Sequence, residues 1–279
     1  MTLTLDHARK IISASLAKAA EGRFKPLTVA VLVCLVCSVF VAGAAIALKP
    51  TQVENRLLDK QRSILAIAGL GEAGMSANKV KQLFNERIVA RLVDLETGKF
   101  SDEFDAKTFD PLVAAKDPAL SKALPGEQDI ASIKRRERYS TVYIVEGQGE
   151  GEIDTLILPV RGYGLWSTLY GFMAVKGDLD TVAGFGFYQH GETPGLGGEV
   201  DNPKWRGQWP GKELFDDNGK LAVQIVKGGV DPQSPRANHQ VDGLAGATLT
   251  SNGVNSLLRF WLGENGFGPF IANLRAGEA

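Results

Sequence analysis

Three kinds of hydrophobic pattern follow one another along the chain. Residues 27–48 form an apolar run without a charged side chain, and a run of this length can cross the hydrocarbon core of a membrane as a helix. Basic residues precede it in the segment 1–26, so the positive-inside rule predicts a cytoplasmic N-terminus and places residues 49–279 on the other side. The pattern therefore predicts a single transmembrane helix followed by one large domain.

The apolar run has a second interpretation, as a cleaved signal peptide. Ala45, Ile46 and Ala47 have the small-residue spacing of a cleavage site. The run is longer than the apolar core of a usual signal peptide, and the leader before it is also long. These lengths favour a retained membrane anchor.

The second pattern is amphipathic and helical. Apolar and charged residues recur at helical spacing over residues 53–68, which predicts a helix that continues from the membrane segment. The hexapeptide 69–74 then matches G-x-G-x-x-G, a dinucleotide-binding fingerprint, and a helix is expected at 76–89. That fingerprint requires a buried strand before the loop and strand–helix alternation after it. Because the preceding pattern is helical and no such alternation follows, dinucleotide binding is the less favoured interpretation.

The third pattern, in the middle of the chain, is typical of strands. β-Branched and aromatic residues cluster in short segments that glycine-containing turns separate. We expect strands at residues 91–97 and 221–226, a hairpin of strands at 139–145 and 153–160, and a second pair of strands at 170–176 and 181–189. Strands gathered in mid-chain, with helices towards both ends, predict an α+β domain with a largely antiparallel sheet and flanking helices.

Composition excludes several classes of function. The formal net charge of −1 gives no support for nucleic-acid binding. Three histidines and two cysteines leave little material for a metal centre. The cysteines, Cys34 and Cys37, form a C-x-x-C pair in the apolar run, where we expect them to act as small hydrophobic residues. No nucleophile–base motif or carboxylate pair is recognisable, so we predict no catalytic residue and no metal ligand.

Two glycine-containing loops follow predicted strands. Residues 161–167 place Tyr163, Leu165 and Trp166 beside two glycines, and residues 190–198 place Glu192, Thr193 and Leu196 beside four more. Each loop has an ordinary interpretation as a turn, the first of them capped by core aromatic residues. Carboxylate, hydroxyl and apolar groups beside flexible glycines equally suit the edge and the face of a flat heterocycle.

The segment 239–261 begins as a glycine-rich loop and continues as an amphipathic helix. Apolar residues recur at helical spacing there, namely Leu249, Val254, Leu257, Leu258 and Trp261. Thr250, Ser251 and Asn252 are natural N-caps, and a helix N-terminus favours an anion. The segment therefore suits a phosphate, although many ordinary helices begin in the same way.

The residues before this helix resemble a known modification motif. Asp242, Gly246, Ala247 and Thr248 are similar to the flavinylation motif of bacterial FMN-binding domains, and Ala245 departs from it where that family usually has a hydroxyl. Together with GYGLWSTLYGF and HGETPGLGGEV, the segment DGLAGATLTSNGV resembles the C subunit of sodium-translocating NADH:quinone reductases. The flavin subunit of Rnf-type complexes is the nearest alternative.

The resemblance implies an electron-carrying subunit of an ion-translocating NADH:ubiquinone oxidoreductase. It implies one FMN joined by a phosphoester to Thr248, in a periplasmic domain of a single-pass protein of the bacterial inner membrane. A flavin transferase attaches the FMN in that family. The other subunits of the complex oxidise NADH, reduce the quinone and carry sodium across the membrane.

The resemblance also gives roles to the loop residues. Gly246 and Ala247 allow close approach of the phosphate, Leu249 and Thr250 begin the helix that binds it, and Asp242 serves the transferase. Around the isoalloxazine ring we expect Glu192, Thr193, Leu196, Tyr163, Leu165 and Trp166. Two other functions remain open, an unmodified membrane-anchored assembly or binding module and an enzyme with freely exchanging FMN.

Overall fold

The structure is a computed structural model that describes residues 3–72, 74–149 and 151–279. The first two residues of the predicted segment 1–26, and Ala73 of the glycine-rich hexapeptide, lie outside the described residues. The chain divides into two compact units, Met1–Leu57 and Leu58–Ala279.

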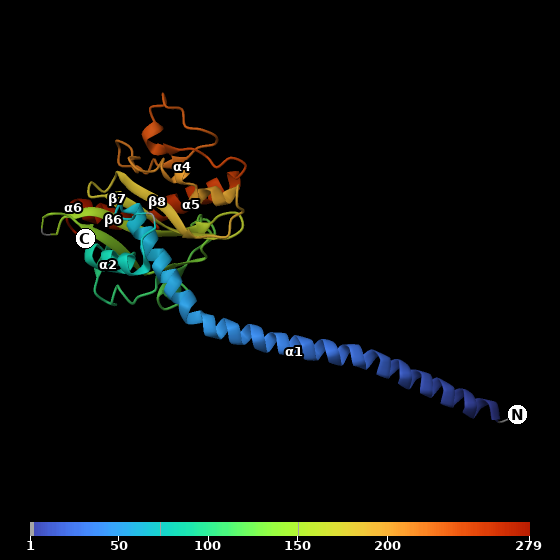
Figure 1. Cartoon of the computed structure of the whole chain (residues 1–279). Coiled ribbons are helices and arrows are strands. Elements are labelled where there is room, and N and C mark those ends of the chain that lie inside the picture. Colours follow the sequence, from blue (N-terminus) through green and yellow to red (C-terminus); the bar gives the residue numbers. More distant parts are fainter. Residues whose placement is uncertain (1–2, 73, 150) are drawn as a thin grey trace. The chain divides into compact units, whose positions relative to one another are not determined.

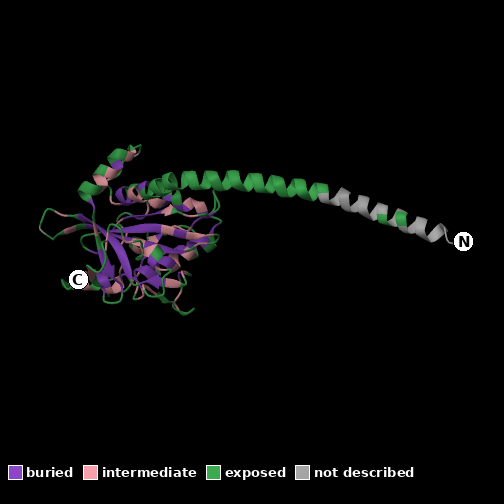
Figure 2. Ribbon diagram, turned by 90° about the horizontal axis from the view of Figure 1, so that it is seen from below, coloured by how far each residue is buried: buried purple, intermediate pink, exposed green. Residues whose placement is uncertain are grey.

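One helix, α1 (Leu3–Ile67), makes up the first unit and continues into the second. Its segment Lys25–Ile67 is long and apolar enough to cross a membrane, and every side chain from residue 25 to residue 57 is exposed (Figure 2). A helix that is apolar on all sides requires apolar surroundings. The helix runs through Pro50 without a break, as predicted, and the preference for a retained anchor stays a prediction.

The second unit is built on a six-stranded antiparallel sheet in the order β2-β1-β5-β6-β7-β8. Figure 1 labels three of its strands, β6, β7 and β8. Its strands are β1 (Val89–Asp94), β2 (Lys99–Ser101), β5 (Tyr139–Glu146), β6 (Ile153–Tyr163), β7 (Thr168–Lys176) and β8 (Val182–Gln189). Short strands elsewhere are β3 (Ser121–Ala123), β4 (Arg135–Glu137), β9 (Gln224–Ile225) and β10 (Gln240–Val241). The α-helices of this unit are α2 (Ala77–Arg87), α3 (Pro111–Ala114), α4 (Pro203–Arg206), α5 (Thr248–Trp261) and α6 (Gly268–Ala276), and the 3₁₀ helices are η1 (Gly197–Asp201) and η2 (Ala237–His239).

Both faces of the sheet are buried, because alternate residues of each strand point to opposite sides. On β5, Val142 and Ile144 pack into the core that includes α5 and α6, whereas Tyr143 and Val145 pack against the end of α1 and against α2. The strands β6 and β7 divide their apolar residues in the same way. The result is a three-layer α/β/α sandwich that confirms the predicted α+β class.

Most of the predicted elements are present, with shifted ends. The two hairpins β5–β6 and β7–β8 are confirmed. The strand expected at 91–97 begins and ends earlier, and the one expected at 221–226 is the short β9, which pairs in parallel with β10. The residues before the hexapeptide 69–74 are helical as far as Ile67. A dinucleotide-binding strand is therefore excluded at this position.

Candidate functional site

The candidate site begins at the N-terminus of α5. Gly246 has a left-handed backbone (φ +71°), which glycine adopts without the steric cost that a Cβ imposes. Ala247 is the N-cap, and no side chain among the described residues caps the helix. The first N–H groups of a helix have no partner within it, so this end presents donors and the positive end of the helix dipole.

The predicted N-caps are wrong by several residues, because Thr250, Ser251 and Asn252 all lie inside α5. Two of these side chains make tertiary hydrogen bonds instead. The Thr250 hydroxyl donates to Glu192 at 2.7 Å, and the Ser251 hydroxyl accepts from the N–H of Leu244 at 3.1 Å.

The faces of α5 separate the two threonines of its first turn. Thr250 is fully buried, whereas Thr248 is exposed. Val254, Leu257, Leu258 and Trp261 are buried, as their spacing predicts. Leu249, which shared that predicted face, is 58% exposed and lies beside Thr248 in sequence. The predicted apolar face is therefore correct only from Val254 onwards, because at 3.6 residues per turn Leu249 lies about 140° around the helix axis from Val254.

The loop 164–167 joins β6 to β7, since Tyr163 at the end of β6 pairs with Thr168 at the start of β7. Tyr163, Leu165 and Trp166 are all exposed, and Trp166 is the most exposed at 67%. They are therefore not the buried caps of an ordinary turn. A Cβ at Gly253 of α5 would collide with the Tyr163 carbonyl, so a glycine in the helix lets the loop pack directly against it.

Glu192 lies in the loop after β8 and is buried, with 5% of its surface exposed. Its carboxylate accepts hydrogen bonds from the N–H groups of Leu165, Trp166 and Ser167 at 3.0–3.2 Å and from the Thr250 hydroxyl. Burial alone raises the pKa of this carboxyl group. The hydrogen bonds from Thr250 and the loop stabilise the charged form more, so the pKa of Glu192 lies below its ordinary value.

The other two residues predicted in this loop are exposed. Thr193 contributes its carbonyl to a turn, accepting from the N–H groups of Leu196 and Gly198. The Leu196 side chain is 45% exposed, and its Cδ2 lies 3.1 Å from the position of a Cβ on Gly246. The structure thus brings Leu196 to the loop that precedes Thr248.

Asp242 is partly buried and holds the backbone ahead of α5. Its Oδ1 accepts from the N–H of Val230 at 2.7 Å, and its carbonyl accepts from the indole N–H of Trp205 at 2.9 Å. The geometry shows a structural use of Asp242, and the predicted role with a transferase stays a prediction.

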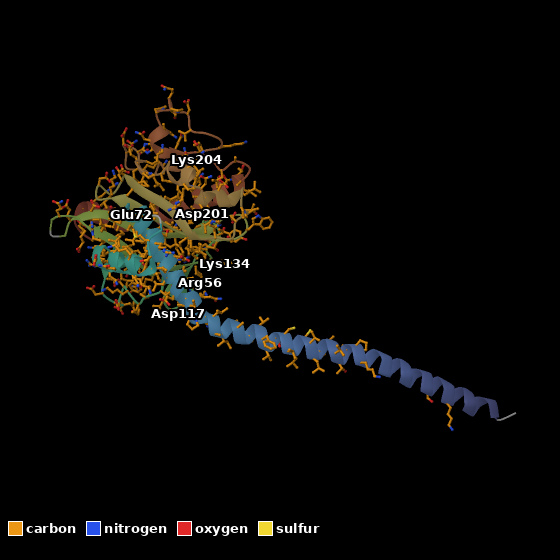
Figure 3. The ribbon with its side chains drawn as sticks, in the orientation of Figure 1. Arg56, Glu72, Asp117, Lys134, Asp201 and Lys204 are labelled. Atoms are coloured by element: carbon orange, nitrogen blue, oxygen red, sulfur yellow. The ribbon has the colours of Figure 1, made fainter. Side chains whose placement is uncertain are left out.

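Three further residues that position the site carry no local sequence signal. The Ser167 hydroxyl accepts from the N–H of Gly191 at 2.6 Å and joins the two loops. Asn255 of α5 bonds both backbone groups of Ile225 in β9. His190 bonds Asp201 at 2.7 Å (Asp201 is labelled in Figure 3). Each contact joins segments that are separated in sequence.

The arrangement combines an exposed hydroxyl, a helix N-terminus and exposed apolar side chains. An anion is favoured at the helix end, and a flat apolar group is favoured against Leu165, Trp166 and Leu196. No cluster of metal-ligating side chains occurs among the described residues. A phosphate ester of an aromatic heterocycle therefore fits the groups that are present.

Comparisons with known proteins agree with this fit. A family model described as an FMN-binding domain matches residues 164–263, which include both loops and α5. A crystal structure of Shewanella oneidensis NqrC has a TM-score of 0.71 at 37% identity, covering 81% of this chain and 99% of that one.

Full-length relatives extend the likeness over most of the chain. The C subunit of the Na(+)-translocating NADH-quinone reductase of Yersinia pestis is 55% identical, over 91% of this chain and 93% of that protein. The protein of the same name from Pseudomonas aeruginosa is 73% identical, over 93% of this chain and 98% of that protein. The chain therefore belongs to the NqrC family, the C subunits of the Na(+)-translocating NADH-quinone reductases.

Proposed function

We propose that this protein is an electron-carrying subunit of a sodium-translocating NADH:quinone reductase and that it carries one FMN joined by a phosphoester to Thr248. The observation that carries the proposal is the exposed Thr248 hydroxyl at the uncapped N-terminus of α5. The exposed side chains of Leu165, Trp166 and Leu196 belong to the two loops beside it. The relatives are NADH-quinone reductase subunits, which favours this assignment over an Rnf-type complex.

The burial of the two threonines supports Thr248 over Thr250 as the attachment residue. A transferase must reach the hydroxyl, and Thr248 is exposed. Thr250 is fully buried, and its proton is already donated to Glu192. Modification of Thr250 would require the first turn of α5 to open.

Attachment is a substitution at phosphorus without any transfer of electrons. The Thr248 oxygen would form a P–O bond to the flavin phosphate while the P–O bond from that phosphorus to a phosphate leaving group of the donor breaks, and the hydroxyl proton would pass to that leaving group or to solvent. A flavin transferase supplies that donor. The free N–H groups at the start of α5 would bind the phosphate oxygens, and the small residues Gly246 and Ala247 would leave room for the phosphate. Leu249 and Thr250 extend the helix end that holds the phosphate.

The bound FMN supplies transfer of one or two electrons, which is the cofactor's own chemistry. The protein binds the ring at an exposed surface. We propose that Tyr163, Leu165 and Trp166 contact it from one loop and that Thr193 and Leu196 contact it from the other. Because this surface is open, a donor and an acceptor subunit can each approach it.

The helix α1 supports membrane attachment. We propose a cytoplasmic segment at residues 1–26, a membrane span at 27–48 and a periplasmic domain at 49–279, in the inner membrane. The partners are the other subunits of the translocase, which oxidise NADH and reduce the quinone, together with the flavin transferase during maturation.

Denaturation of the protein, purified after co-expression with its flavin transferase, separates the possible functions. We expect the yellow flavin absorbance to stay with the unfolded chain through gel filtration. Release of the flavin would identify an exchangeable cofactor. A colourless chain would identify an unmodified assembly module and remove the proposal.

A further inference from the structure

Glu192 is the most heavily bonded carboxylate of the candidate site. Its Oε1 accepts from three consecutive backbone N–H groups, those of Leu165, Trp166 and Ser167, at 3.0–3.2 Å. Its Oε2 accepts from the Thr250 hydroxyl at 2.7 Å. One side chain thus bonds both the loop between β6 and β7 and the first turn of α5, which lies 58 residues further along the chain.

The surroundings of this carboxylate leave no room for another side chain. A Cβ on Gly164 would lie 2.7 Å from Oε1, and a Cβ on Gly197 would lie 2.7 Å from Oε2 and 2.6 Å from the Thr250 hydroxyl. Real Cβ atoms do not approach so closely. Glycine on both sides therefore lets the protein close around the Glu192 carboxylate, and the residue is only 5% exposed.

The charge of Glu192 is held by neutral donors. Among the described residues, its carboxylate bonds backbone N–H groups and one hydroxyl, and the salt bridges of this part of the chain join other residues. The titratable imidazole of His190 accepts a hydrogen bond from the backbone N–H of Glu192 at 3.2 Å, but no salt bridge joins a cation to the Glu192 carboxylate within the described part of the chain. Such a charge acts on its surroundings over several ångströms, because the protein interior screens it less than water does.

We propose that Glu192 is a positioning residue which fixes the loop 164–167 to α5 and at the same time places a buried negative charge, held by hydrogen bonds rather than by a salt bridge, behind the proposed flavin surface. Glu192 acts through the residues that it holds. Leu165 and Trp166 are the exposed members of the loop, and Thr250 lies two residues from Thr248. The positional part of this inference concerns the protein alone, and its redox part rests on the proposed function.

The redox consequence follows from simple electrostatics. Reduction adds negative charge to the flavin, and a fixed anion close by makes that addition less favourable. Removal of the Glu192 charge should therefore raise the reduction potential of the bound flavin. Two variants separate charge from position. Glu192→Gln removes the charge and keeps the size of the side chain, with its carbonyl facing the loop N–H groups. Glu192→Ala removes the charge and every hydrogen bond.

Hydrogen exchange of the full-length protein in detergent tests the positional part without any need for flavin. In Glu192→Ala we expect the amides of Leu165, Trp166 and Ser167 to exchange roughly ten- to a hundredfold faster, as for loss of a charge-assisted hydrogen bond. Glu192→Gln and Thr250→Val should fold normally and give smaller increases at the same amides.

Glu199→Gln is the matched control for the exchange experiment. Glu199 lies in the following helix η1 and bonds Asn202, so its substitution should leave the exchange of the three loop amides unchanged. Wild-type exchange rates at these amides in Glu192→Gln, Thr250→Val and Glu192→Ala alike would overturn the inference.

A redox titration of the flavin-loaded protein tests the second part. Glu192→Gln should shift the flavin midpoint potential upwards, whereas Thr250→Val, which leaves the charge in place, and Glu199→Gln should shift it less. A Glu192→Gln potential equal to that of the wild type would remove the electrostatic role. If no flavin loads at all, the proposed function fails, and the exchange experiment still decides the positional part.

Discussion

The buried ion pair between Arg161 and Glu137 offers a stability prediction that follows directly from geometry. Glu137 is 1% exposed and Arg161 is 7% exposed. Arg161 donates to Glu137 at 2.8 Å and to the carbonyl of Arg135 at 3.1 Å. The Arg161 carbonyl accepts from the indole N–H of Trp261 in α5 at 2.6 Å. The pair therefore supports the end of β6, two residues before Tyr163.

Glu137→Gln leaves the Arg161 charge buried without its counter-ion. Burial lowers the pKa of Arg161, but the charge and the hydrogen bond of Glu137 raise this pKa by more than burial lowers it. Arg161 therefore stays ionised in the native protein. Breaking a buried pair by removing one partner costs about 3–5 kcal/mol. In a unit of this size that corresponds to a fall in Tm of roughly 6–20 °C. The double variant Glu137→Gln with Arg161→Met has no unpaired charge, so most of the loss should be restored.

Tryptophan fluorescence during thermal unfolding measures this effect in the folded domain, because all four tryptophans lie between residues 166 and 261. The exposed Glu127 provides a matched control, and Glu127→Gln should leave Tm unchanged. A decrease in the free energy of unfolding of less than about 1 kcal/mol in Glu137→Gln would refute the reasoning, and so would a double variant that is no more stable than Glu137→Gln alone.

Three further predictions concern the candidate site. Gly253→Ala should lower stability by about 1–3 kcal/mol in chemical unfolding, because its Cβ collides with the Tyr163 carbonyl; Gly126→Ala, whose Cβ meets nothing, is the neutral control, and equal stability of the two variants would contradict the packing. The lowered pKa of Glu192 contributes stability that is fully present above the ordinary glutamate pKa and is lost as pH falls through the lowered value. In Glu192→Gln the free energy of unfolding should therefore depend less on pH in that range than in the wild type, and an unchanged pH dependence would argue against the lowered pKa of Glu192. Trp166→Ala should leave Tm nearly unchanged, since this side chain is 67% exposed, but should shift the flavin potential; an unchanged redox titration would remove Trp166 from the ring surface.

Local patterns in the sequence predicted the elements that local patterns determine. Clusters of β-branched and aromatic residues with glycine-containing turns between them predicted the hairpins β5–β6 and β7–β8, and helical spacing predicted the buried face of α5 from Val254 to Trp261. The motif predicts that this helix begins just after it, at Leu249 and Thr250, and α5 begins one residue earlier, at Thr248. These features depend on neighbours in the chain.

Contacts between distant segments decided what the sequence did not predict. Thr250 and Ser251 look like N-caps because nothing nearby in the sequence shows that the Thr250 hydroxyl donates to Glu192 and that the Ser251 hydroxyl accepts from the N–H of Leu244. Glu192 itself looks like a surface ligand until the loop 164–167 closes over its carboxylate. Gly253 has no recognisable purpose in a helical pattern until Tyr163 is seen against it.

Peptide mass spectrometry after denaturation tests the central claim most directly. The protein is co-expressed with its flavin transferase and compared with the variants Thr248→Ala and Thr250→Val. The account predicts that the peptide containing Thr248 carries the mass of FMN less one water, that Thr248→Ala abolishes this addition, and that Thr250→Val retains it. An unmodified wild-type peptide, or an addition that persists in Thr248→Ala, would contradict the account.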